Sequence, residues 1–185
     1  MAEKLTNNAD IIANEPIDTA KLTRAREIIL GLQEELKDYI AGGSGPFLAA
    51  IYDEKGNLIA KTANSVVSET CSHNHAEMNA IKAAEKALNT YDLSAYSPRL
   101  YVTAEPCIMC LGGILWSGIK EVYYGVPSAD VEKITGFDEG FKPQWTEEFK
   151  RRGIVVYGNI EPQAGKRVLE DYVNQNHIIY EPHRK

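Results

Sequence analysis

The sequence predicts a single α/β domain in which short strands alternate with helices around one core. The chain has 185 residues, a usual length for one domain. Its hydrophobic residues make up 44% and its charged residues 25%, which is typical of a globular protein and not of a disordered chain or a coiled coil. Short apolar segments alternate with longer stretches whose apolar residues recur at helical spacing. This alternation is typical of a layered α/β domain.

The N-terminal residues lack clear periodicity, so we expect residues 1–17 to form a flexible or loosely docked extension and residues 18–185 to form the domain. The first predicted element is an amphipathic helix. Its apolar residues recur every three or four positions from Leu22 to Ile40, with Asp18 or Thr19 as the N-cap and Gly42-Gly43 as the end.

The remaining elements follow in alternation. Apolar residues 47–52 and 58–63 flank a Glu-Lys-Gly-Asn turn and predict a β-hairpin. The Ala-rich stretch 75–88 predicts a helix. Further strands are expected over 99–103, 121–125 and 154–157, and further helices over 108–117, 130–134, 146–152 and 164–174. Because a helical stretch separates the last two strands, they can run parallel.

The charge balance disfavours some partners. The net charge is −6 and the pI is near 5.3, and no long basic run is present, so nucleic acid is an unlikely partner. Apolar runs are short and the N-terminus lacks the order of a signal peptide, so we expect no membrane span and a cytoplasmic location. Three cysteines make a poor disulfide framework, which favours metal binding.

Two short motifs carry the chemistry: His75-Ala76-Glu77 and Pro106-Cys107-Ile108-Met109-Cys110, each at the start of a predicted helix. A histidine followed by an acid and a later P-C-x-x-C is a known signature of zinc-dependent deaminases. Catalytic zinc takes three Cys and His ligands and a water. His75, Cys107 and Cys110 supply three, and the helix start favours the thiolate. Zinc lowers the pKa of water to about 7, and Glu77 is placed to move its proton.

Two other readings of the cysteines stay open. A lone C-x-x-C is also found in redox pairs and in structural zinc sites. A structural site needs a fourth protein ligand, for which Cys71 and His73 are candidates. Such a closed site would leave no position for water and no task for Glu77.

The motifs and the order of elements resemble the cytidine-deaminase-like superfamily, and more closely its branch of guanine deaminases and tRNA adenosine deaminases. The resemblance spans about residues 22–180. It implies a three-layer α-β-α sandwich with a five-stranded mixed sheet and hydrolytic removal of an exocyclic amine. It also implies one Zn²⁺ per chain, held by His75, Cys107 and Cys110, with Glu77 as the proton shuttle.

The resemblance also implies substrate contacts. Asn64, after the second strand, matches an asparagine that hydrogen-bonds the base, Phe47 matches a residue of the pocket wall, and the N–H of Ala76 is expected to point toward the substrate. The segment around Trp116 is similar to guanine deaminases as well, although a tryptophan on an apolar helix face is more often part of the core.

Residues 134–140, Ile-Thr-Gly-Phe-Asp-Glu-Gly, favour the guanine deaminase branch. The resemblance implies that a carboxylate of this segment, Glu139 or else Asp138, meets the amino edge of guanine; a solvated acidic loop is the alternative. The implied reaction converts guanine to xanthine and ammonia by attack of water at C2. Aminotriazines such as ammeline are further possible substrates of such enzymes.

The C-terminal residues 174–180 follow the last helix, and in similar guanine deaminases such a segment is exchanged between subunits. The resemblance therefore implies a homodimer in which an exchanged segment places His177 or Tyr180 over the partner's site; a solvated tail is the alternative for the same residues. Two functions compete with guanine deamination. One is tRNA adenosine deamination, and the other is a zinc-stabilised binding protein without catalysis.

Overall fold

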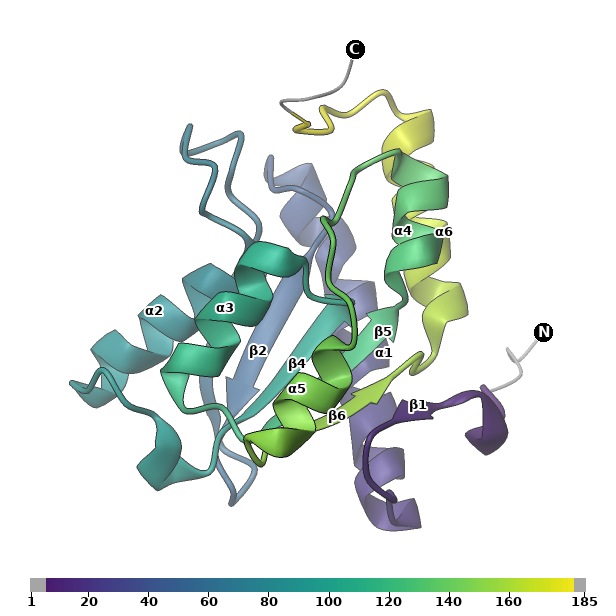
Figure 1. The fold of residues 1–185 in the computed structure, drawn as a ribbon. Coiled ribbons are helices and arrows are strands. Elements are labelled where there is room, and N and C mark those ends of the chain that lie inside the picture. The colour runs from purple at the N-terminus through teal and green to yellow at the C-terminus, as the bar shows by residue number, and fades with distance from the viewer. Residues whose placement is uncertain (1–5, 182–185) are drawn as a thin grey trace.

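The computed structural model describes residues 6–181 and has a mixed sheet of six strands between two layers of helices (Figure 1). The strand order is β1-β6-β5-β4-β2-β3. The strands are β1 (Ile12–Ala13), β2 (Leu48–Tyr52), β3 (Leu58–Ala63), β4 (Arg99–Ala104), β5 (Glu121–Val126) and β6 (Val155–Gly158). The helices are α1 (Thr19–Ala41), α2 (Ala76–Leu88), α3 (Ile108–Ser117), α4 (Ser128–Thr135), α5 (Trp145–Arg151) and α6 (Pro162–Asn174), with 3-10 turns η1 (Asn8–Asp10) and η2 (Ser94–Tyr96).

The predicted three-layer sandwich is confirmed, and the ends of the predicted elements agree with the observed ones to within two residues. Helices α2, α3 and α5 share one hydrophobic core with one face of the sheet, and α1 and α6 share a second core with the other face. Strand β2 runs antiparallel to β3 and β4, whereas β4, β5 and β6 are parallel, as the intervening helices require.

The sixth strand corrects the expected count of five. Strand β1 belongs to the predicted extension and pairs antiparallel with β6. Next to it, the Asn14 amide donates to the carbonyls of Thr146 and Ile154, and its oxygen accepts the N–H of Val156 at 2.8 Å. Residues 6–17 are thus docked on the sheet edge; residues 1–5 and 182–185 lie outside the described chain. A two-residue strand leaves no periodic signal in a sequence.

Local sequence explains where the longest helix begins and which face it buries. The side chain of Asp18 accepts the N–H of Lys21 at 2.8 Å and caps α1, and Gly42 ends the helix. The buried stripe of α1 packs on a row of tyrosines that the sheet register aligns. Tyr101, Tyr123 and Tyr157 are consecutive partners on β4, β5 and β6, with ring centroids 4.6 and 5.1 Å apart.

The topology brings several loops to one edge of the sheet. Because β3 is antiparallel to β2, and β2 is antiparallel to β4, β3 and β4 point the same way, as does β5. The segments that follow these three strands therefore emerge together, and they lead into Asn64, the Cys107 turn and α4. Ligand sites of α/β proteins usually lie at such carboxyl ends of strands. No helix in the described residues is long and apolar enough to cross a bilayer.

Two glycine-to-alanine changes test the packing. At Gly158 of β6 a Cβ would lie 1.9 Å from the ring of Tyr124, which is buried, so Gly158→Ala should lower the free energy of unfolding by about 1–3 kcal/mol. At exposed Gly31, inside α1, a Cβ meets nothing within 4 Å. Gly31→Ala should therefore raise the free energy of unfolding by about 0.5–1 kcal/mol. Urea unfolding followed by circular dichroism measures both; shifts of the same sign would contradict the packing described.

Candidate active site

Three potential metal ligands meet at the starts of two helices. The Nδ1 of His75 lies 3.4 Å from the Sγ of Cys107 and 3.6 Å from the Sγ of Cys110, and the two sulfurs are 3.6 Å apart. His75 is the N-cap residue of α2 and Cys107 that of α3, and neither side chain caps its helix. Both side chains are thus free to turn toward a shared ion.

This triangle fits zinc. Tetrahedral zinc with Zn–N near 2.0 Å and Zn–S near 2.3 Å places its nitrogen and sulfur ligands about 3.5 Å apart and two sulfurs about 3.8 Å apart. The observed distances match these values closely. Within the described residues, neither Cys71 nor His73 joins this group, so the donor set has three members and leaves the fourth tetrahedral position for water.

The two thiols are electrostatically unequal. The hydrogen bond with Cys110, together with that with His75, lowers the pKa of Cys107 to about 4, and burial opposes this shift. The same thiol pair and burial raise the pKa of Cys110 well above its ordinary value. The Cys107 thiol therefore loses its proton easily, whereas the Cys110 thiol does not. A bound cation would deprotonate Cys110 as well, because a thiol that coordinates a metal loses its proton.

Glu77 lies on the wall of a pocket beside these ligands. Its position in the first turn of α2 follows directly from the H-x-E spacing, and the side chain is buried. Burial, and then the charge of Cys107, raise the pKa of Glu77 to about 7. A carboxyl group with a pKa near neutrality can both accept and donate a proton at physiological pH, as a proton shuttle requires.

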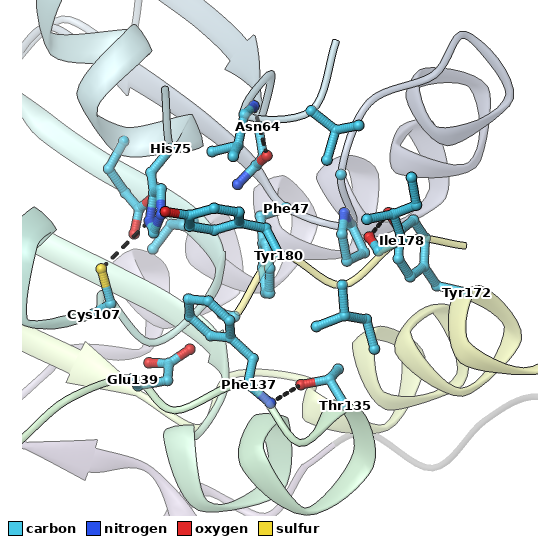
Figure 2. Close-up of a pocket in the computed structure, with 18 of the residues that line it drawn as sticks. Phe47, Asn64, His75, Cys107, Thr135, Phe137, Glu139, Tyr172, Ile178 and Tyr180 are labelled. Carbon is cyan, nitrogen blue, oxygen red and sulfur yellow. Dashed lines mark hydrogen bonds between the residues drawn. The ribbon is translucent and has the colours of Figure 1, made fainter. Parts of the chain in front are cut away.

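The pocket has a mostly apolar wall with a few polar groups at defined positions. Asn64 is one of them: its Oδ1 accepts the N–H of Val66 at 3.2 Å, and its amide nitrogen points into the pocket in Figure 2. Other lining residues are Phe47, Val102, Ala104, Thr135, Phe137, Tyr172, Ile178, Ile179 and Tyr180. An apolar slot with a few polar groups suits a flat heterocycle.

The acidic segment separates into one buried and one exposed carboxylate. Glu139 is 3% exposed and lines the pocket, and burial raises its pKa to about 7, while the nearby charge of Lys142 opposes this shift. Asp138 is exposed and its Oδ1 accepts the N–H of Gly140 at 2.8 Å. Of the two acids that the sequence left open, Glu139 is the one at the pocket, and the segment is not simply a solvated loop.

The C-terminal segment lies against the pocket of its own chain. Tyr180 crosses the pocket with its hydroxyl end toward His75 (Figure 2), and Ile178 is held by a hydrogen bond from the Tyr172 hydroxyl to its carbonyl at 2.8 Å. His177 is exposed and stacks on the ring of Tyr172 with centroids 4.6 Å apart. Tyr180 thus lies over the pocket of its own chain, whereas the sequence led us to expect it over the partner's site, and His177 lies outside the lining residues.

Two expected substrate contacts do not line the pocket. Trp116 is 83% exposed on the outer side of α3, so it belongs neither to the core nor to the pocket. It lies nine residues after Cys107, about 13 Å further along the helix, which explains why it cannot reach the site. Ala76 is fully buried at the start of α2 and is not a lining residue either.

Sequence reasoning missed part of the site. Phe137, in the segment that was singled out, faces His75 with ring centroids 6.2 Å apart, and Tyr172 closes the far wall. Lys142 forms an ion pair with Glu139. Glu139 and Lys142 lie in a segment without helix or strand, so their spacing does not predict the pair. Tyr172 gave no signal either, because an aromatic residue on a helix usually belongs to the core.

Comparisons with known proteins agree with this site. Residues 25–126 match the family described as the cytidine and deoxycytidylate deaminase zinc-binding region. The guanine deaminase of Bacillus subtilis is 41% identical over 132 residues, which are 71% of this chain and 73% of that protein. The tRNA-specific adenosine deaminase of the same organism is 40% identical over 119 residues, covering 64% of this chain and 70% of that protein.

Solved structures resemble the whole fold. NE0047 in complex with 8-azaguanine is 34% identical with a TM-score of 0.79, and the match covers 91% of this chain and 90% of that one. The guanine deaminase from Nitrosomonas europaea is 35% identical with a TM-score of 0.75, covering 85% and 93%. With its zinc ligands, buried glutamate and matching fold, the chain belongs to the cytidine and deoxycytidylate deaminase zinc-binding family and is a zinc-dependent deaminase.

Proposed function

We propose that the protein hydrolyses guanine to xanthine and ammonia. The observation that carries this proposal is the buried Glu139, which lines the same pocket as His75 and Glu77. A carboxylate is an acceptor, and the N1–H and amino edge of guanine offers donors to it. The names of the similar proteins, guanine deaminases among them, support the same substrate.

The roles of the protein groups follow from their positions. When zinc is bound, it lowers the pKa of a water to about 7. The Glu77 carboxylate takes a proton from a water as the water oxygen bonds to C2, and gives that proton to the ring nitrogen next to C2. It then takes the remaining proton of the new C2 hydroxyl and gives it to the amine, so that the C2–N bond breaks, ammonia leaves and the carbonyl of xanthine forms. Both tasks suit a carboxyl group whose pKa is near 7. Asn64 donates from its amide nitrogen to an acceptor of the base, and Phe47 packs on the ring of the base.

A small-molecule substrate accounts for the pocket better than a nucleic acid does. Tyr180 lies across the pocket, so a base attached to RNA would need the tail to move away. The net charge of −6 supplies no general attraction for phosphates. Deamination of tRNA adenosine, the activity named for one relative, is therefore the second candidate. A non-catalytic binding role would leave Glu77 without a task.

Other features of the proposal rest on the resemblance alone. They are activity on aminotriazines such as ammeline and a homodimer; the cytoplasmic location is an expectation from the sequence pattern. The tail lies on its own chain's pocket in the structure, and an exchange of this segment between two subunits would place the same residues over the partner's pocket. His73 has no assigned role.

The first test of the mechanism is Glu77→Gln. Gln keeps the size of the side chain but cannot carry the proton, so kcat should fall by at least about 10²–10⁴-fold while the protein keeps its zinc. Stopped assays of ammonia release, with zinc measured by atomic absorption, check both expectations. Full activity of the zinc-loaded variant would disprove the shuttle.

The second test separates the two acids of residues 138–139. Glu139→Gln replaces the buried acceptor by a group with a donor, so kcat/KM for guanine should fall by at least about 10²-fold. Asp138→Asn is the matched control: its side chain is exposed, and kcat/KM should stay within about twofold. Equal losses in both variants, or no loss in Glu139→Gln, would refute the assignment of Glu139.

A further inference from the structure

A buried lysine lies behind Glu139. The Nζ of Lys142 is 3.1 Å from Oε2 of Glu139 and 3.1 Å from Oε1 of Glu105, and it donates to the carbonyl of Pro106 at 2.8 Å. Its side chain is 10% exposed, and the side chains of Glu139 and Glu105 are 3% and 12% exposed. Lysine is almost never buried unless it is paired, and here two carboxylates and a carbonyl supply the partners.

The two carboxylates depend on Lys142 to different degrees. Glu105 also accepts the backbone N–H of Ser128 and the indole N–H of Trp145, each at 3.0 Å. Glu139 accepts the Ser128 hydroxyl at 2.8 Å and Lys142, both at Oε2. These bonds leave Oε1 as the oxygen for the pocket, toward which the carboxylate is turned in Figure 2.

The charged groups near Glu139 come from several elements. Glu132 of α4 accepts the backbone N–H of Glu139 at 3.4 Å, and burial and the charge of Cys107, at the start of α3, raise the pKa of the Glu139 carboxyl. Glu105 pairs with the same lysine and lines the same pocket, and the charge of Glu139 also acts on His75. Among the described residues, Lys142 is the cation in contact with Glu139.

We propose that Lys142 is a positioning residue for specificity, which holds Oε2 of the ionised Glu139 so that Oε1 accepts from the amino edge of the substrate. The inference rests on the proposed function, because that function gives Glu139 its contact with substrate. Without Lys142, Oε2 of Glu139 keeps only the Ser128 hydroxyl as a donor, so the carboxylate is no longer held in one orientation. Glu105 keeps two other donors, the Ser128 N–H and the Trp145 indole N–H, so Glu139 is the acid that depends more on the lysine.

The test is Lys142→Met, with kcat/KM for guanine measured at pH 7. We expect a loss of about 10- to 100-fold, because a charged hydrogen bond is lost. On a Glu139→Gln background the same change should cost less than about threefold, because the carboxylate that it serves is gone.

Controls separate this role from a structural one. Zinc content and thermal unfolding are measured for each variant, and Lys21→Met removes a lysine that pairs with Glu121 at 2.9 Å and should leave kcat/KM unchanged. A loss that adds fully to that of Glu139→Gln overturns the inference. If Glu139→Gln is impaired and Lys142→Met is normal, only the inference fails. A wild-type protein that does not turn over guanine, or a fully active Glu139→Gln, refutes the proposed function and the inference together.

Discussion

The convergence of two helix N-termini on one point is the constraint on which the rest of the structure depends. His75 precedes α2 and Cys107 precedes α3, and their ligand atoms lie 3.4 Å apart. This requires β3 and β4 to point the same way and α2 and α3 to pack side by side on one face of the sheet. The pocket lies at this edge of the sheet. Glu77 lines it from the first turn of α2, and Asn64 lines it from the position directly after β3.

Buried charge is concentrated around this point. Glu77 and Glu139 line the same pocket, and burial raises the pKa of each to about 7. Burial of ionisable groups costs stability, so such groups are retained where they serve a function. Glu77 stands next to the zinc ligands, whereas Glu139 is backed by a lysine and a serine hydroxyl. The two acids therefore have the environments that a proton carrier and a fixed acceptor need.

The sequence predicted those parts that depend on local spacing. The ligand set follows from C-x-x-C and H-x-E at helix starts, and the capping of α1 by Asp18 follows from local side-chain chemistry. The parts it did not predict depend on contacts between distant segments. Strand β1 is held on β6 by backbone pairing and by hydrogen bonds of the Asn14 side chain to the backbone of Ile154 and Val156. Trp116 was misplaced because a similar motif says nothing about which side of a helix faces the pocket.

Ammonia release from guanine by the purified protein, with its zinc measured, tests the account most directly. The comparison compounds are ammeline, guanosine, adenine, cytosine and cytidine, which vary the amino edge, the ring and the attached sugar. The account predicts about one zinc per chain and the highest kcat/KM for guanine, because Glu139 and Asn64, on different sides of the pocket, offer an acceptor and a donor to the polar groups of the base. A zinc-loaded protein that releases no ammonia from any of these compounds would contradict it.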